Sequence, residues 1–193
     1  MNYYISDTHF GCTNLFENRT LEHDILIKEN WNKVVTNADD VYILGDIGKC
    51  GGNANNEYLC SIISTLKGRK HLILGNHDDI KDKRIAQLFV EICDYKEIID
   101  NTNGINRALV LSHYPIFSWN GAYKSNKKQA ILLYGHLHNN FDNMVFQNSL
   151  KELRKEALNQ DRVLNLPYAY NVGAMMFYMN YYPKTLKQIL ESN

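Results

Sequence analysis

Short apolar runs recur along the chain, and each one ends directly before a polar segment. The runs are rich in Ile, Leu, Val and Tyr, and glycine or polar residues bound them. Continuous apolar runs of this length predict strands that are buried on both faces. In sheets built with helical crossovers, ligands bind beyond the carboxyl ends of the strands, so we expect the polar segments to meet at one edge. The runs cover residues 2–5, 41–44, 71–74, 108–111 and 131–134.

The intervals between these runs carry apolar residues at helical spacing. Such spacing predicts helices with one buried face. Gly68 is a suitable C-terminal stop for the second of them. The predicted helices of this kind cover residues 21–35, 58–66 and 78–93. Residues 149–159 predict a further helix, charged on most faces, and a short final helix opens at Pro183.

Strands cluster in the second half of the chain. Residues 95–100 and 107–111 predict a hairpin with its turn at 101–104. Residues 168–172 predict another strand, and the aromatic-rich stretch 175–182 predicts a last one. Alternating strands and helices followed by clustered strands predict a mixed α/β sandwich.

Length and composition are those of an ordinary globular protein. The chain has 193 residues, of which 45% are hydrophobic, and its formal net charge is zero. We therefore expect a single domain over residues 1–193. Zero net charge disfavours a protein built mainly to hold nucleic acid, although it leaves room for a small nucleotide or a local basic patch.

The sequence also predicts a cytoplasmic protein with reduced thiols. The N-terminus is polar and resembles no signal peptide, and no apolar stretch approaches the ~20 residues of a membrane span. Cysteines that form no close pair favour free thiols, and their spacing disfavours a thiolate metal site. They are Cys12, Cys50, Cys60 and Cys93.

The residues that follow the apolar runs have the composition of a metal site. Side chains two apart on a strand face the same way, so Asp7 with His9, and His136 with His138, can each direct two ligands to one point. Carboxylate and amide oxygens mixed with imidazoles suit manganese, iron or zinc. Any one of these histidines alone has an ordinary structural interpretation, but five of the seven histidines follow such runs. They are His9, His77, His113, His136 and His138.

Two loops are candidates for substrate contact. Residues 48–56 are rich in Gly and Asn, but they lack the Gly-Lys-Ser/Thr ending of a phosphate-binding P-loop, so a mobile loop at the site edge is the favoured interpretation. Residues 118–129 follow a strand that leads to the site and carry Lys124, Lys127 and Lys128. This second loop is either a substrate contact or an ordinary solvated loop.

The order of these motifs resembles that of the calcineurin-like metallophosphoesterase superfamily, and the similarity covers nearly the whole chain. The flanking segments Ser6–Gly11, Leu111–Pro115 and Asn171–Gly173 are similar to its small bacterial and phage members. The resemblance implies a four-layer α/β/β/α sandwich of the metallo-dependent phosphatase type. The matching motifs are Asp7-x-His9, Gly45-Asp46, Gly75-Asn76-His77-Asp78, His113 and Gly135-His136-x-His138.

The resemblance also implies a role for each of these residues. It implies two divalent metal ions, with Mn²⁺ favoured and Fe or Zn as alternatives, and hydrolysis of a phosphoester by metal-activated hydroxide. His77 would be the catalytic residue that protonates the leaving oxygen, and it would not bind metal. The implied ligands are Asp7, His9 and His138 for one ion, Asn76, His113 and His136 for the other, and Asp46 as the bridge.

Residues around these ligands leave alternatives open. Asp78 would either orient His77 or a neighbouring ligand, or cap a surface helix. Asn14 and Arg19 resemble loop residues of the small relatives, and Arg19 would reach a phosphate or form a surface ion pair. Lys49 stands where the superfamily often has an outer aspartate, so we expect tuning of the site there.

The leading hypothesis is therefore an enzyme acting on a small phosphoester or nucleotide-type substrate, with phosphodiesters favoured over monoesters. No membrane partner is expected. One alternative is a nuclease or nucleic-acid-end phosphoesterase on the same site, which zero net charge disfavours. Another is a non-catalytic scaffold, which the retention of His77 and all seven ligands disfavours.

Overall fold

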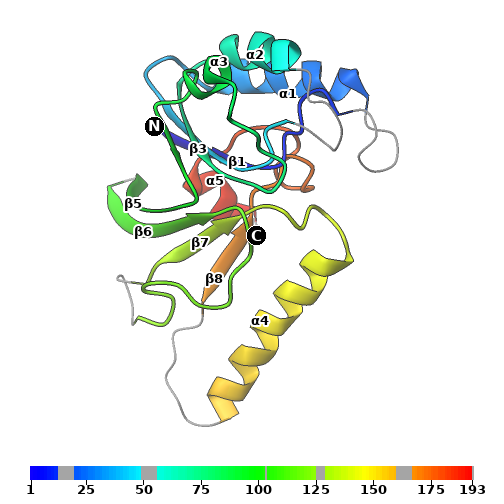
Figure 1. Ribbon diagram of the computed structural model, residues 1–193. Helices are drawn as coiled ribbons and strands as arrows, with labels where there is room; N and C mark the ends of the chain where they lie inside the picture. Colours follow the sequence, from blue (N-terminus) through cyan, green and yellow to red (C-terminus); the bar gives the residue numbers. More distant parts are fainter. Residues whose placement is uncertain (13–19, 49–55, 103, 125–128, 160–166, 193) are drawn as a thin grey trace.

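Two four-stranded sheets stack on one another, and helices cover their outer faces (Figure 1). The computed structural model describes residues 1–12, 20–48, 56–102, 104–124, 129–159 and 167–192. The order of layers is three helices, the first sheet, the second sheet and a long fourth helix. This arrangement confirms the predicted α/β/β/α sandwich.

The first sheet is parallel throughout and has the order β1-β2-β3-β4. The second has the order β5-β6-β7-β8, with β5 and β6 forming an antiparallel hairpin and the other pairs parallel. The strands are β1 (Asn2–Ile5), β2 (Asp40–Leu44), β3 (Arg69–Ile73), β4 (Glu91–Cys93), β5 (Tyr95–Thr102), β6 (Ile105–Ser112), β7 (Ile131–Tyr134) and β8 (Tyr168–Asn171).

The helices cover the sheets unequally. Three helices lie on the first sheet, α4 lies on the outer face of the second, and α5 contacts β1 and β5. The helices are α1 (Leu21–Val34), α2 (Asn56–Ser64), α3 (Lys83–Ala86), α4 (Phe141–Asn159) and α5 (Leu186–Glu191). In the described part of the chain, none of them has both the length and the apolar character that a bilayer crossing requires.

Burial on both faces explains the continuous apolar runs. In β2, Ile43 packs toward the helices, whereas Leu44 packs into the layer between the sheets. In β7, Leu133 faces that same middle layer, and Leu132 faces α4 together with Phe146. A strand buried on both faces has no polar alternation, and the strands predicted from the five apolar runs were confirmed.

Two segments predicted from helical or strand patterns adopt other structures. Residues 78–93 contain only the short α3, because Ile92 pairs with Leu72 as part of β4. Tertiary pairing here overrides a helical spacing of apolar residues. Residues 175–182 form successive turns in place of a strand, and Met179 fills the layer between the sheets.

Helix α4 begins eight residues earlier than the predicted start at residue 149, at Phe141. The side-chain oxygen of Asn140 accepts hydrogen bonds from the backbone N–H groups of Asp142 at 3.0 Å and Asn143 at 3.3 Å. Asparagine is a favoured N-cap because its side chain satisfies such free N–H groups. The Asn-rich segment therefore starts the helix, although its composition indicated a loop.

The expectation of reduced cysteines was wrong for Cys12. Cys12 is disulfide-bonded, whereas Cys60 and Cys93 are free thiols. The segment after β1 lies beside the segment after β2, where Phe10 and Gly48 form a parallel bridge. Sequence spacing alone does not reveal this proximity.

Candidate metal centre

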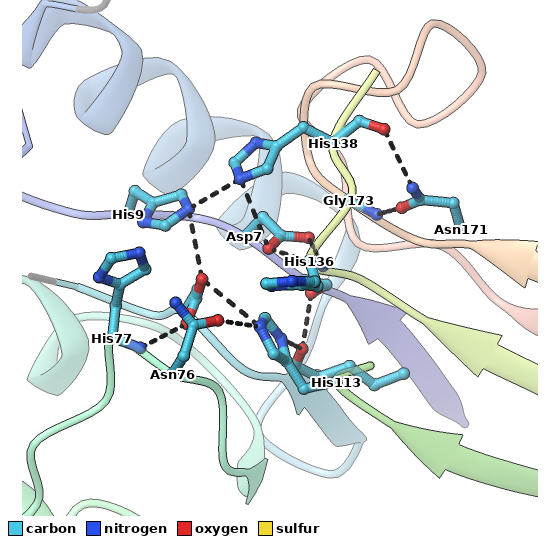
Figure 2. A network of polar contacts seen from close by, with 12 residues as sticks. Asp7, His9, Asn76, His77, His113, His136, His138, Asn171 and Gly173 are labelled. Carbon is cyan, nitrogen blue, oxygen red and sulfur yellow. Dashed lines mark hydrogen bonds and ion pairs between the residues drawn. The ribbon is translucent and has the colours of Figure 1, made fainter. Parts of the chain in front are cut away.

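The predicted ligands converge where the carboxyl ends of the two sheets meet (Figure 2). Asp7, His9, Asp46 and Asn76 follow strands of the first sheet. The second sheet contributes the histidines that follow β6 and β7, namely His113, His136 and His138.

One candidate ligand group consists of Asp7, His9 and His138. Their ligand atoms lie within 4.8 Å of one another. The Nε2 atoms of His9 and His138 are 3.3 Å apart, and Nε2 of His138 is 3.9 Å from Oδ1 of Asp7. Imidazole nitrogens and a carboxylate oxygen thus face one common point.

The second group consists of Asp46, His113 and His136, whose ligand atoms also lie within 4.8 Å of one another. Oδ1 of Asn76 joins it, at 3.0 Å from Nε2 of His113. Oδ2 of Asp46 lies 3.5 Å from Nε2 of His113 and 3.8 Å from Nε2 of His9. One carboxylate oxygen therefore faces both groups.

The electrostatics of the centre fit a bound cation. Asp7 and Asp46 are each 1% exposed. Burial raises the pKa of the Asp7 carboxyl to about 8, and the nearby Asp46 carboxylate contributes to that rise. Burial also lowers the pKa of His136, and His113 lowers it further, which favours a neutral imidazole able to bind metal. This set of oxygen and imidazole ligands suits manganese, iron or zinc.

Backbone groups orient the ligands from behind. Nδ1 of His113 lies 2.8 Å from the carbonyl oxygen of Leu44 and donates to it, which directs the Nε2 lone pair toward the centre. The carboxylate of Asp7 accepts from the backbone N–H of His136 at 3.1 Å through both oxygens. Each sheet therefore fixes a ligand that belongs to the other sheet.

Most of these ligands have left-handed backbone conformations. The φ angles are 54° at Asp7, 44° at His9, 53° at Asp46, 68° at His136 and 47° at His138. Non-glycine residues seldom adopt such angles, and clusters of them mark functional sites. The ligand pairs thus converge through left-handed turns beyond the strand ends, and the expectation that each pair lies on one face of a strand was wrong.

The glycines that precede the ligands leave room for close packing. A Cβ atom on Gly75 would lie 2.3 Å from Oδ1 of Asp46. On Gly135 it would lie 2.6 Å from Oδ2 of Asp7 and closer still to Ser6. Any larger residue at either position would displace a carboxylate of the centre.

His77 lies beside the centre without joining either ligand group (Figure 2). Its backbone N–H donates to Oδ1 of Asp46 at 2.9 Å, and its ring centroid is 5.7 Å from that of His9. The residue as a whole is partly exposed.

Asp78 binds backbone groups. Its carboxylate accepts from the N–H groups of Gly75 at 2.8 Å, Asp46 at 2.9 Å and Ile47 at 2.9 Å. The N-cap of α3 is Asp82, four residues later. Asp78 therefore holds the segment after β2 against the segment after β3. Through its hydrogen bond with the backbone N–H of Asp46, it also orients that candidate ligand.

Asn171 also supports the centre, a role that its sequence position did not indicate. Its Nδ2 group donates to the carbonyl oxygen of His138 at 3.1 Å and to Oδ1 of Asn143 at 3.0 Å. Its Oδ1 accepts from the N–H of Gly173 at 2.8 Å. This buried amide links β8, the start of α4 and the turn that carries His138.

Asp24 is a second supporting residue whose role its sequence position does not indicate. It lies on α1 and is 1% exposed, and its Oδ2 accepts from the N–H of Gly11 at 2.7 Å and from the hydroxyl of Tyr58 at 3.0 Å. It anchors the chain directly after His9. An aspartate within an amphipathic helix carries no signal of such a role, because its partners lie far away in sequence.

Some of the residues proposed from the sequence cannot be placed. The remaining candidates Asn14, Arg19, Lys49, Lys127 and Lys128 lie outside the described residues.

Comparison with known proteins identifies the family. A sequence model of the calcineurin-like phosphoesterases matches residues 3–173. The chain belongs to the calcineurin-like phosphoesterase family. This membership indicates a hydrolase that acts on phosphoesters with divalent metal ions.

Relatives of this calcineurin-like phosphoesterase occur in phages. The chain is 31% identical to the Gene 66 protein of Mycobacterium phage D29 over 155 residues, which cover 70% of this chain and 77% of that one. It is 42% identical to the Gene 66 protein of Mycobacterium phage L5 over 81 residues, 39% of each chain. The crystal structure of a protein of unknown function from Aquifex aeolicus matches with a TM-score of 0.66 and 26% identity, covering 99% of this chain and 98% of that one.

Proposed function

We propose that the protein hydrolyses small phosphoesters, phosphodiesters in preference to monoesters, at a centre of two divalent metal ions. One observation carries this proposal. Oδ2 of Asp46 lies 3.5 Å from the imidazole nitrogen of His113 and 3.8 Å from that of His9, so it faces both ligand groups. A carboxylate between two cations is the bridge that such a centre requires.

The assignment of ligands follows the two groups. Asp7, His9 and His138 would hold one ion, while Asn76, His113 and His136 would hold the other, with Asp46 shared. Mn²⁺ is the proposed metal, with Fe and Zn as alternatives. When bound, paired cations activate water for attack on phosphorus and offset the charge of the phosphate oxygens.

His77 is the proposed general acid. The hydrogen bond from its backbone N–H to Asp46 fixes it next to the centre, at 2.9 Å. Its imidazole remains outside both ligand groups, so it is available to protonate the leaving oxygen. Asp78 keeps this segment in place through its contact with the N–H of Gly75.

The charge of the named site residues supports the preference for diesters. The seven ligands include two carboxylates, Asp7 and Asp46, and five neutral groups. Two divalent ions over two carboxylates leave a net charge of +2, and the hydroxide of the proposed reaction lowers it to +1, which suits the single charge of a phosphodiester. A monoester dianion gains more from additional cationic side chains.

A substrate panel with metal-loaded protein tests the proposal. Bis-p-nitrophenyl phosphate, p-nitrophenyl phosphate and single-stranded DNA are compared with added Mn²⁺ and after chelation. The proposal predicts metal-dependent turnover with the highest kcat/KM on the diester. A higher kcat/KM on DNA would favour the nuclease alternative, and no turnover on any substrate would favour a scaffold.

A further inference from the structure

Exposed aromatic side chains begin directly after the ligand His113. Tyr114 is 45% exposed and Phe117 is 55% exposed. Both lie in the segment that leaves β6, and Tyr114 is the immediate neighbour of His113 in sequence. Single exposed apolar residues are common, but aromatic rings exposed next to a polar site are candidates for ligand recognition. We call Tyr114 and Phe117 the aromatic shelf.

Tyr114 touches the second ligand group through its ring. Its ring centroid lies 5.0 Å from that of His113 and 4.7 Å from that of His136, with interplanar angles of 76° and 64°. Its hydroxyl forms no hydrogen bond with any part of the chain that the structure describes. These edge contacts fix the ring against two ligands and leave much of its surface open next to them.

Phe117, three residues after Tyr114 in the same segment, is held in place by its own neighbours. Its ring packs on Phe146 of α4 with a centroid distance of 5.3 Å. Its carbonyl oxygen accepts from the hydroxyl of Tyr123 at 2.9 Å. Two residues later, the buried Trp119 donates through Nε1 to the carbonyl of Ala130 at 3.0 Å. The exposed rings are therefore held in place before any ligand arrives, which lowers the entropy cost of binding.

We propose that the aromatic shelf binds a planar aromatic group esterified to the phosphate, as in nucleoside phosphodiesters. This inference rests on the proposed function and specifies its substrate class. A phosphate held at the second ligand group adjoins His113 and His136, so its ester substituent meets Tyr114 first. Stacking of a base on an aromatic side chain needs no particular base, because every base presents a π-face. Tyr114 is thus a residue that determines specificity.

Two diesters with the same leaving group test this inference. p-Nitrophenyl thymidine 5′-phosphate retains a nucleoside after cleavage, whereas methyl p-nitrophenyl phosphate retains a methyl group. The measured quantity is the ratio of kcat/KM for the nucleoside ester to kcat/KM for the methyl ester. The ratio is compared between wild type, Tyr114→Leu and Tyr114→Phe. Tyr168→Leu is the matched control, because Tyr168 is also 45% exposed but begins β8 at the opposite end from the centre.

The aromatic shelf predicts a wild-type ratio well above one. Tyr114→Leu lowers this ratio about tenfold, mainly through KM for the nucleoside ester, a size typical of losing one stacking partner. Tyr114→Phe keeps the ratio within about twofold of wild type, since the ring remains. Tyr168→Leu leaves the ratio unchanged. An equal loss on both esters in Tyr114→Leu, or an unchanged ratio, would overturn the inference.

A second variant controls for the possibility that replacing Tyr114 disturbs His113 and His136, which its ring contacts. Phe117→Ser removes the other half of the shelf without altering a contact to His113 or His136, and it should lower the same ratio severalfold. Metal content is measured for every variant and should equal that of wild type. Failure of the proposed function itself would appear differently, as the absence of metal-dependent cleavage of both esters by the wild-type protein.

Discussion

Oδ2 of Asp46 lies 3.5 Å from Nε2 of His113. Asp46 follows β2 of the first sheet and His113 follows β6 of the second, so this contact joins the two sheets at their common edge. The same division applies to both ligand groups, because each draws side chains from both sheets. Neither sheet alone holds a complete group, and metal binding at this edge should therefore also stabilise the packing of the sheets.

His77→Ala should retain both metals yet lose most of its activity. The side chain belongs to neither candidate ligand group, so its removal leaves the proposed metal ligands in place. Loss of a general acid typically costs 10²–10⁴-fold in rate, and we expect kcat to fall within about this range. Metal analysis and steady-state kinetics on the same sample measure both quantities. Equal loss of metal and activity would identify His77 as a ligand instead.

Asp78→Asn should loosen the centre without abolishing its chemistry. The carboxylate accepts from three backbone N–H groups, and an amide offers one acceptor oxygen and adds a donor facing these groups. We expect a loss of about 1–3 kcal/mol in the free energy of unfolding and weaker metal binding. Denaturant titration and metal titration measure these effects.

Asp82→Asn is the control for that variant, because Asp82 caps α3 away from the ligands. It should cost less stability and leave metal affinity unchanged. If both variants affected metal binding equally, the contacts of Asp78 would have no special connection to the centre.

Asn171→Ala should weaken metal binding by about 10–100-fold, the usual cost of losing a group that orients a ligand. Asn171 donates to the carbonyl of His138 and so fixes the turn that carries this ligand. Asn32→Ala is a matched control, because Asn32 also bridges two segments, through Thr65 and Lys67, far from the centre. Isothermal titration with Mn²⁺ distinguishes them, and similar affinities in the two variants would count against the role of Asn171.

Asp7 should make the stability of the metal-free protein depend on pH. Burial raises the pKa of its carboxyl from the ordinary 3.8 to about 8, so the folded state holds this proton more tightly than the unfolded state. The contribution to stability is therefore full below pH about 4 and is lost as pH rises toward about 8.

Asp7→Asn lacks this titration and tests the prediction. The Tm of the metal-free variant, relative to that of the metal-free wild type, should increase between pH 5.5 and pH 8.5. Differential scanning calorimetry in the presence of a chelator measures both proteins. A Tm difference that stays constant over this range would show that Asp7 is readily ionised without a cation.

The layers of the fold could be predicted from the sequence because strands that are buried on both faces consist almost entirely of apolar residues. Strands such as β2 and β7 are buried on both faces, and the hydrophobic effect requires apolar residues at every position there. Short elements are harder to predict, because their few residues give a weaker hydrophobic pattern. The segment with Ile92 has helical spacing but pairs with β3, and the pairing partner decides its structure.

The sequence indicated which residue types gather at the centre but not how the backbone presents them. Left-handed φ angles at His9 and His138 depend on neighbouring segments, and no local pattern of non-glycine residues encodes them. The roles of Asn171 and Asp24 are equally hidden, because each depends on hydrogen bonds to groups distant in sequence. Such supports become visible only when the chain is folded.

The number of metal ions bound per chain, in wild type and in Asp46→Asn, tests the central claim most directly. Protein is freed of metal, titrated with Mn²⁺ and analysed for bound metal after removal of the excess. A shared carboxylate predicts two ions per wild-type chain and a marked loss of affinity at both positions in the variant. One ion per wild-type chain, or a variant that loses one ion and binds the other with unchanged affinity, would contradict a centre bridged by Asp46.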